Sequence, residues 1–317
     1  MDTKSSEAVS PLLALSNDLA DAVERAGRSV VAVNARPRTP SSGVYWREGV
    51  VVTADHTVKR DEEISITFPD GRAAPATLAG RDPSTDLAVI RVEAASLPAA
   101  EIADASSLQV GHMVLAVGRR EGQGEADPGS LGASLGVVSA LGGSWRTWRG
   151  GQIDRFIRLD LTIFLGFSGG PLVNAQGRVA GINTTGLWRG AGLAIPASTV
   201  DRVARELLEK GRIARGYLGL GMHPVTLPEA LQRRLSLPAG GGMIAFAVEP
   251  DGPAERAGAL LGDVLVALDG KPVSDVGDVG AILGGERVGK EISARFIRGG
   301  ALVELKITVG ERPMREA

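Results

Sequence analysis

The stretch of this sequence whose residue types best fit covalent chemistry is a serine among glycines, Gly166-Phe167-Ser168-Gly169-Gly170. Glycine reaches positive φ angles and lets the backbone come close to a ligand. Such a backbone exposes one hydroxyl and directs amide N–H groups at the oxygen beside it, as a serine nucleophile with an oxyanion hole requires. The alternative is a glycine-rich turn between two strands in which Ser168 has no chemical role. The stretch alone does not separate the two.

A serine nucleophile needs a base, and the chain offers three histidines, His56, His112 and His223. His56 is the best candidate because it follows an apolar run that is typical of a strand. His112 stands at the start of a later strand-like run, where a surface histidine is the ordinary interpretation. His223 lies much further along the chain. A lone histidine is more often structural, and a nucleophile-like serine in the same region weakens that interpretation.

The base in turn needs a carboxylate on its other ring nitrogen. Asp86 directly precedes an apolar run, which indicates a carboxylate at the rim of a core. Asp55 is adjacent to the histidine in sequence, which usually directs it elsewhere, while Asp82 and Asp160 remain alternatives on spacing. The order histidine, Asp86, serine is that of chymotrypsin-type enzymes and not of α/β-hydrolases.

The elements that must hold these residues are mostly short strands. Between residues 29 and 197, short runs rich in apolar and β-branched residues alternate with turn signals such as Pro69-Asp70-Gly71. This pattern is typical of antiparallel barrels or sandwiches.

Helical periodicity flanks this region on both sides. Residues 10–27 carry one apolar stripe that ends at a glycine, with Ser10 as the N-cap. Residues 198–210 have Ser198 and Asp201 in capping-box spacing and also end at a glycine. A domain boundary follows this second helix, because roughly 100 further residues suffice for another compact domain.

Composition limits the classes of function. The chain has 317 residues, 44% of them apolar, so it can bury a core. Its net charge is −2 with both signs interspersed, which gives no electrostatic footprint for nucleic acid or an anionic membrane. The absence of cysteine excludes thiol catalysis, and three histidines argue against a metal site. No cofactor is predicted.

The N-terminal stretch lacks a basic region, and the apolar run Pro11-Leu12-Leu13-Ala14-Leu15 is too short for a signal peptide or a membrane span. We therefore expect a cytoplasmic protein. An exported form trimmed of its signal would have the same sequence.

The sequence contains four ordered blocks, Thr53-Ala54-Asp55-His56-Thr57-Val58, Ser84-Thr85-Asp86-Leu87-Ala88-Val89, Gly166-Phe167-Ser168-Gly169-Gly170-Pro171-Leu172 and Gly192-Leu193-Ala194-Ile195-Pro196. These blocks resemble those of the HtrA/Deg family of serine proteases, and the resemblance covers nearly the whole chain. It implies a mainly β protein in which a helical segment, 1–28, precedes a chymotrypsin-like double β-barrel protease domain, 29–210. A PDZ domain, 211–312, follows.

The resemblance implies a role for each residue of the site. His56 would be the general base, Asp86 would orient it, and Ser168 would be the nucleophile. The backbone N–H groups of Gly166 and Ser168 would form the oxyanion hole, with no cofactor or metal. The implied activity is that of a serine endopeptidase that cleaves unfolded or misfolded polypeptides through an acyl-enzyme.

The resemblance also implies how substrate binds. Ile163 and Gly186 would line the specificity pocket, and Thr184 and Thr185 would pair with the substrate backbone. Gly186 stands where the family often has an aliphatic residue, so a more open pocket is expected. Phe167 stands where the family usually has asparagine, and we expect it to change the mouth of the site or its resting conformation.

The stretch Tyr217-Leu218-Gly219-Leu220 resembles the carboxylate-binding loop of a PDZ domain, which binds peptide C-termini as an added strand. A helix over 276–283 would form the other wall. A packing domain without a ligand is the alternative for this segment. The family also forms homotrimers, with residues 10–46 as the contact region. For the whole chain, the alternative is a catalytically silent peptide-binding or chaperone-like protein, which Phe167 motivates.

Overall fold

The chain divides into two compact units, Met1–Arg212 and Ile213–Ala317. Residues 1–9 of the helical segment expected at 1–28 lie outside the described residues, as does residue 312 of the segment expected at 211–312. The computed structural model describes residues 10–37, 39–93, 97–119, 130–188 and 192–311.

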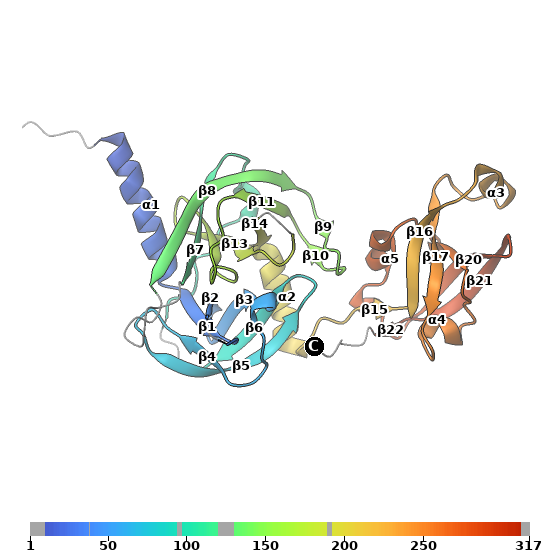
Figure 1. Cartoon of the computed structure of the whole chain (residues 1–317), viewed down its shortest axis with the longest axis horizontal. Helices are drawn as coiled ribbons and strands as arrows, with labels where there is room; N and C mark the ends of the chain where they lie inside the picture. The colour runs from blue at the N-terminus through green and yellow to red at the C-terminus, as the bar shows by residue number, and fades with distance from the viewer. Residues whose placement is uncertain (1–9, 38, 94–96, 120–129, 189–191, 312–317) are drawn as a thin grey trace, which may run out of the picture. The chain divides into compact units, whose positions relative to one another are not determined.

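Two closed six-stranded barrels make up most of the first unit (Figure 1). In the first barrel the strand order is β1-β2-β3-β6-β5-β4, and all neighbours are antiparallel. Alternating side chains, mostly valine and isoleucine, point inward and fill it. The strands are β1 (Val30–Asn34), β2 (Ser41–Arg47), β3 (Val50–Ala54), β4 (Ile64–Thr67), β5 (Ala73–Asp82) and β6 (Leu87–Val92).

The second barrel has the strand order β11-β14-β13-β12-β7-β8 and its own apolar core. The 3-10 helix η2 (Ala105–Ser107) precedes it, and a small hairpin of β9 (Trp145–Arg146) and β10 (Gln152–Ile153) extends from it. The mainly β double barrel predicted from the sequence is confirmed. The barrel strands are β7 (Met113–Arg119), β8 (Leu131–Gly142), β11 (Phe156–Asp160), β12 (Pro171–Asn174), β13 (Val179–Thr184) and β14 (Gly192–Pro196).

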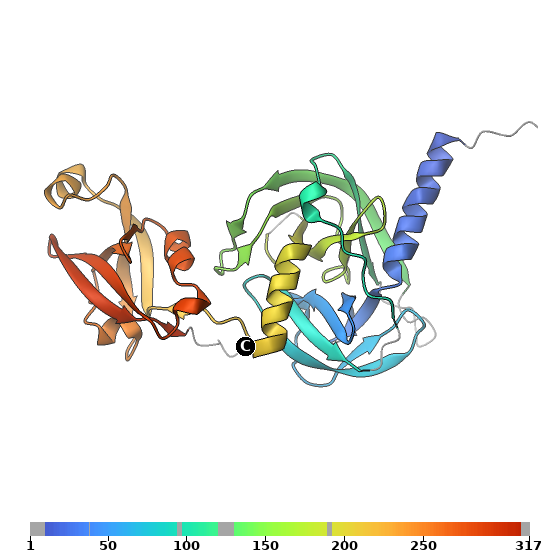
Figure 2. The same ribbon diagram turned by 180° about the vertical axis from the view of Figure 1, so that it is seen from behind.

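Helix α2 (Ala197–Lys210) packs across both barrels, contacting β5, β6, β13 and β14 (Figure 2). It ends at Gly211, whose φ of 73° is the left-handed conformation typical of a helix stop. The capping box predicted from Ser198 and Asp201 does not form. Asp201 instead accepts a hydrogen bond from the Trp46 indole, which attaches the helix to the first barrel.

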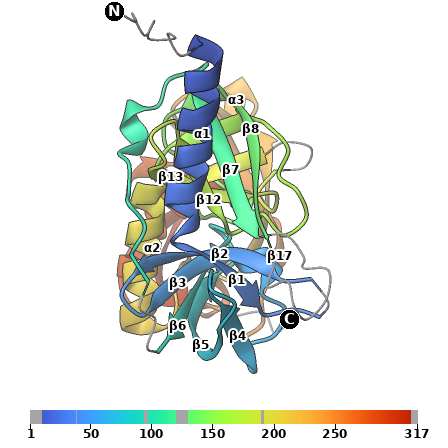
Figure 3. The same cartoon turned by 90° about the vertical axis from the view of Figure 1, so that its left-hand side faces the viewer.

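Helix α1 (Pro11–Gly27) packs only through its C-terminal half. Ala22 and Gly27 are buried, and the helix contacts β7 and β12. Figure 3 shows its N-terminal half extending beyond the barrels, and there Leu12 is 78% exposed. The Ser10 side chain makes no capping bond, contrary to the prediction.

The second unit contains a six-stranded sheet in which β16-β17-β18-β20-β21 form a continuous order and β19 pairs with β18. Helix α5 contacts the edge strand β16, and Asp275 and Asp278 form a capping box at its start. The elements are β15 (Gly216–Tyr217), β16 (Leu220–Thr226), α3 (Glu229–Arg234), β17 (Gly241–Val248), α4 (Pro253–Arg256), β18 (Val264–Leu268), β19 (Lys271–Pro272), α5 (Val276–Ile282), η3 (Gly285–Arg287), β20 (Glu291–Arg298), β21 (Ala301–Thr308) and β22 (Gly310–Glu311).

Candidate active site

His56 lies on a 3-10 turn, η1 (Asp55–Thr57), directly after β3. Side-chain contacts on both sides of the histidine hold this turn. The buried Asp55 carboxylate bonds to the Arg81 guanidinium at 2.5 Å, and the Thr57 hydroxyl donates to a backbone carbonyl three residues earlier at 2.7 Å. The His56 side chain itself remains 30% exposed, so a substrate can reach it.

Asp86 lies in the turn between β5 and β6, with a left-handed φ of 59°. A non-glycine residue rarely adopts this conformation. The buried Asp82 carboxylate stabilises the turn by accepting bonds from Ser84 and Thr85. Thr147, from the β9–β10 hairpin, donates its hydroxyl to the Ser84 carbonyl at 2.6 Å. Both barrels therefore hold the turn that carries Asp86.

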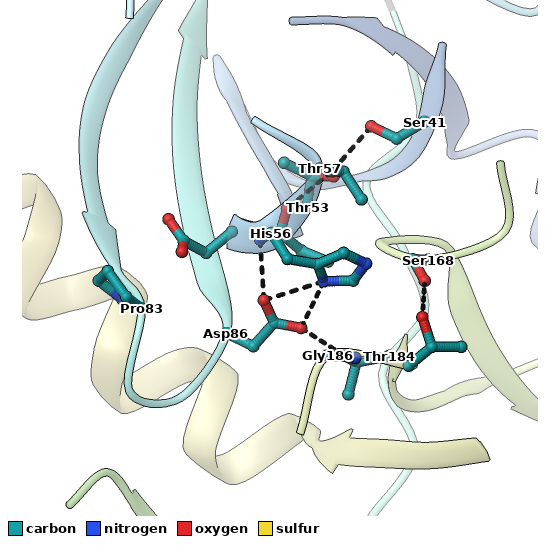
Figure 4. Close-up of polar contacts among 12 residues, drawn as sticks. Ser41, Thr53, His56, Thr57, Pro83, Asp86, Ser168, Thr184 and Gly186 are labelled. Atoms are coloured by element: carbon teal, nitrogen blue, oxygen red, sulfur yellow. Dashed lines mark hydrogen bonds and ion pairs between the residues drawn. The ribbon is translucent and has the colours of Figure 1, made fainter. Parts of the chain in front are cut away.

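The two turns bring His56 and Asp86 together (Figure 4). Asp86 Oδ2 lies 2.8 Å from His56 Nδ1, and Asp86 Oδ1 accepts the His56 backbone N–H at 2.8 Å. The carboxylate is 3% exposed, and the Thr184 hydroxyl donates a hydrogen bond to it. An acceptor at Nδ1 places the proton there and leaves Nε2 as the base. In Figure 4 the imidazole lies between Asp86 and Ser168.

The other candidate carboxylates lie in different surroundings. Burial raises the pKa of Asp55 above its ordinary value, while the bonded Arg81 opposes this change. Asp82 is occupied by the turn before Asp86. Asp160 is exposed on β11. Of the four carboxylates considered from the sequence, Asp86 alone is hydrogen-bonded to His56 in the described part of the chain.

Ser168 lies in the loop between β11 and β12 and is 7% exposed. The next residue, Gly169, has a φ of 89°, and a Cβ there would lie 2.3 Å from the Ser42 carbonyl oxygen. Only glycine fits this close turn. The Ser168 hydroxyl lies 3.3 Å from the Thr185 hydroxyl, and no hydrogen bond among the described residues joins it to His56.

The peptide group between Gly166 and Phe167 is fixed at both ends. Its carbonyl accepts bonds from the Ser42 backbone N–H at 2.8 Å and from the Ser42 hydroxyl at 2.7 Å. Its N–H donates to the Phe164 carbonyl at 2.9 Å. The N–H groups of Gly166 and Ser168, on either side, have no partner among the described residues. These are the two donors predicted for the oxyanion hole, and both are free to bind an oxygen.

Ser42 is not among the residues predicted from the sequence. It is fully buried at the start of β2, and its hydroxyl also accepts the Arg119 backbone N–H at 2.8 Å. The signal in the sequence is the polar pair Ser41-Ser42 at the start of an otherwise apolar strand. A buried hydroxyl must find hydrogen-bond partners, so such a pair indicates a specific network.

Phe167 does not lie at the mouth of the site, contrary to the expectation. Its side chain is fully buried, in edge-to-face contact with Phe164 at 5.5 Å between ring centroids. A Cβ at Gly118 would lie 2.7 Å from the Phe167 ring, so the barrel wall opens a space for it. An apolar side chain at this position turns inward because burial removes it from water.

Gly186 lies against the histidine and the aspartate. A Cβ at Gly186 would lie 2.7 Å from both His56 Nδ1 and Asp86 Oδ2. The side chain of Ile163 lies elsewhere, where a Cβ at Gly192 would contact it at 3.0 Å. The missing side chain of Gly186 therefore gives the chain room to cover the His56–Asp86 pair.

In the second unit, the turn Leu218-Gly219 connects Tyr217 of β15 to Leu220 of β16. Gly219 has a φ of 76°. The carbonyls of Leu218 and Gly219 accept bonds from the backbone of Ala254 and Glu249, whereas their N–H groups have no partner among the described residues. Two adjacent amide donors without a partner among the described residues thus lie directly before an edge strand.

The described residues contain no group of three or more histidine, aspartate or glutamate side chains arranged to hold a metal ion. Within the same residues, no helix combines the length and apolarity that crossing a bilayer requires.

Two family models match the chain. A trypsin-like peptidase domain matches residues 41–182, and a PDZ domain matches residues 216–309. Among solved structures, the HtrA-type protease AlgW with a decapeptide has 30% sequence identity and a TM-score of 0.74, and the match covers 94% of this chain and 99% of AlgW. A serine endoprotease from Yersinia pestis has 31% identity and a TM-score of 0.74, with 93% and 98% covered.

Curated relatives are similar over most of this chain. A probable periplasmic serine endoprotease, DegP-like, from Pseudomonas fulva is 33% identical over 300 residues, which cover 89% of this chain and 60% of the relative. A protein of the same name from Brucella suis is 34% identical, with 88% and 54% covered. The chain thus spans a little more than half the length of these relatives.

The location expected from the sequence is wrong. Relatives at this level of identity are named periplasmic, which contradicts a cytoplasmic protein. The expectation rested on an N-terminal stretch without signal features. Such a stretch does not specify a compartment, because signal peptides are removed from mature exported proteins.

Proposed function

The chain belongs to the HtrA family of serine proteases, and from this premise we propose that it is a serine endopeptidase that cleaves unfolded or misfolded polypeptides. The observation that carries the proposal is the hydrogen bond between buried Asp86 and His56 Nδ1. It makes Nε2 a base on the side of Ser168. A histidine without a chemical role would not need this orientation.

In the proposed reaction, Ser168 Oγ attacks the peptide carbonyl and gives its proton to His56 Nε2. The oxyanion accepts hydrogen bonds from the N–H groups of Gly166 and Ser168. His56 then protonates the leaving amine, and water hydrolyses the acyl-enzyme by the same route. Asp86 stabilises the imidazolium throughout, and Thr184 supports that carboxylate.

The resting serine is consistent with this role. Its hydroxyl lies 3.3 Å from the Thr185 hydroxyl, and the proposed reaction requires it to turn toward His56. Catalytic hydrogen bonds often tighten only when substrate is bound. We propose that substrate pairs with the backbone near Thr185 and thereby completes the contact. Ile163 would line the specificity pocket.

We propose residues 29–210 as the protease domain and 211–312 as the PDZ domain, in which Tyr217, Leu218, Gly219 and Leu220 bind the carboxylate of a peptide C-terminus. The free N–H groups of Leu218 and Gly219 support this role. So does AlgW, which was solved with peptides. The relatives' names favour action outside the cytoplasm.

We also propose a homotrimer with its contacts in residues 10–46. Leu12, Leu13 and Leu15 are exposed on α1 without a partner in the described chain, and a second copy of the chain would cover them.

The alternative is a catalytically silent peptide-binding or chaperone-like protein, which Phe167 motivated as a residue that changes the mouth of the site or its resting conformation. The Phe167 side chain is fully buried, which removes the first of these two reasons. The family comparisons give this alternative no support.

A fluorophosphonate probe and casein cleavage test the proposal. We expect the probe to label wild-type protein at Ser168 and casein to be cut. Ser168→Ala should abolish labelling and lower the rate of cleavage by at least ~10⁴-fold. Ser107→Ala, a change at an exposed serine of η2, is the matched control and should behave as wild type. If the probe does not label the wild-type protein and casein stays intact, the proposed endopeptidase activity is wrong.

A further inference from the structure

The open edge of the sheet in the second unit contains a proline. Strand β16 pairs on one side with β17 and on the other side with no strand of the described chain. Helix α5 runs beside this open edge (Figure 1). Pro224 lies within β16, opposite Met243 of β17, and is exposed. A peptide that adds to this sheet must pair with the edge on which Pro224 lies.

The direction of Pro224 follows from its missing N–H. In an antiparallel sheet, the N–H and C=O of one residue point to the same side, and successive residues alternate. Proline is tolerated in a sheet where its nitrogen faces the open edge. Pro224 therefore faces the peptide side, and so do the N–H and C=O of Met222, two residues earlier. Met222 offers a donor and an acceptor, whereas Pro224 offers only an acceptor.

The length of the helix beside the edge gives an independent limit. α5 has seven residues, Val276–Ile282, and begins at the capping box of Asp275. Seven helical residues span about 10 Å. An extended peptide covers that distance with about three residues. Helix α5 therefore ends after about as many peptide residues as the part of β16 that offers N–H donors before Pro224.

We propose that Pro224 sets the length of peptide that this site recognises. A C-terminal peptide held at Leu218 and Gly219 places its last residue beside Leu220, its third from last beside Met222 and its fifth from last beside Pro224. At the fifth residue one ladder hydrogen bond is missing and the proline ring occupies its place. Recognition is therefore confined to the last four residues. This inference rests on the proposed binding of peptide C-termini.

The test uses the full chain with Ser168→Ala, so that peptides are not cut. An octapeptide library with a fixed Thr-Thr-Thr-Lys start and four random C-terminal residues supplies the tightest binder. Its affinity is compared with that of its own acetylated C-terminal tetrapeptide. In the protein with Pro224, the two should agree within about twofold. With Pro224→Ala, the octapeptide should bind about fivefold more tightly than the tetrapeptide, as one additional hydrogen bond predicts.

Further variants and peptides distinguish the length limit set by Pro224 from the recognition of peptide C-termini. Pro228→Ala, at the start of α3 and outside β16, should keep the original ratio. Pro224→Val should act like Pro224→Ala if the restored donor is the cause. If the octapeptide already binds fivefold more tightly than the tetrapeptide to the protein with Pro224, the length limit is wrong. The length limit is also wrong if the ratio of the two affinities is unchanged in both Pro224 variants. Neither result bears on the recognition of C-termini. A library without binders, or an amidated octapeptide that binds as well as the acid, refutes recognition of C-termini and the length limit with it.

Discussion

The peptide group beside the candidate nucleophile is held by a residue that is far from it in sequence. Ser42 holds the Gly166–Phe167 peptide through its backbone N–H and its hydroxyl, and the Arg119 N–H donates to the same hydroxyl. This peptide lies between the two amides proposed for the oxyanion hole. A donor in such a hole is effective only when it is fixed before the reaction starts. Ser42 is therefore a positioning residue that acts through the backbone.

We expect Ser42→Ala to lower kcat about tenfold with little change in KM. The alanine keeps the backbone N–H bond to Gly166 but loses the hydroxyl bonds, so the transition state is affected more than substrate binding. Steady-state kinetics on a fluorogenic peptide measure both constants. Ser29→Ala changes a buried serine whose hydroxyl donates to the Ala26 carbonyl, remote from the site, and it is the matched control that should leave both unchanged. A KM that rises while kcat stays constant would contradict the role.

At the scale of elements, two turns of the first barrel determine the distance between His56 and Asp86. One is η1, which the buried Asp55–Arg81 ion pair holds, and the other is the turn that Asp82 organises. Burial raises the pKa of Asp55, so its ionised form is less stable in the folded chain than in the unfolded chain. Arg81 offsets part of this cost. The ion pair therefore fixes a catalytic turn at the expense of a buried charge.

Arg81→Ala should destabilise the protein by ~3 kcal/mol at pH 7, because it leaves the Asp55 carboxylate buried without its partner. The loss should shrink as the pH falls through the raised pKa of Asp55 toward its ordinary value of 3.8, because Asp55 then becomes protonated in the folded and the unfolded chain. Denaturant unfolding of wild type and variant at pH 7 and about pH 3.5 measures this difference.

The matched control is Arg72→Ala, which breaks the exposed pair with Asp70 and should change stability little at either pH. Adding Asp55→Asn to Arg81→Ala should recover part of the loss. An equal loss at both pH values would show that Arg81 acts by packing and not through the charge of Asp55.

At the scale of the whole molecule, the leucines at the start of α1 are exposed to solvent, and nothing in the described part of a single chain covers them. Leu12, Leu13 and Leu15 are 78%, 55% and 39% exposed, while the buried residues of the same helix are small. Apolar side chains grouped on one exposed helix are typical of an interaction surface. A trimer would remove them from water.

We expect the protein to have three times the mass of one chain in solution. Changing Leu12, Leu13 and Leu15 to serine should yield monomers that retain the barrels, since these side chains contribute nothing to the barrel cores. Light scattering measures the mass, and circular dichroism verifies the fold. The triple change Leu260→Ser, Leu261→Ser and Leu302→Ser, at exposed positions of the second unit, is the control. A monomeric wild type would refute the assembly.

The sequence by itself determined what depends on local pattern. Short apolar runs separated by turns predicted antiparallel barrels or sandwiches, and the family resemblance favoured the double barrel. The glycine at 211 predicted a helix end, and the order of three blocks predicted the candidates His56, Asp86 and Ser168. Helix starts were less predictable. Ser10 and Ser198 have suitable positions but make no capping bonds. Asp201, the expected partner of Ser198, instead accepts a bond from the Trp46 indole, which is distant in sequence.

The tertiary structure alone decided what each side chain contacts across the barrels. Phe167 turns into a space beside Gly118, Gly186 covers the His56–Asp86 pair, and Ser42 reaches the Gly166 carbonyl. None of these contacts joins residues close in sequence. Their physical cause is packing density, because a closed interior admits one set of neighbours for each side chain, and local pattern carries no information about that set.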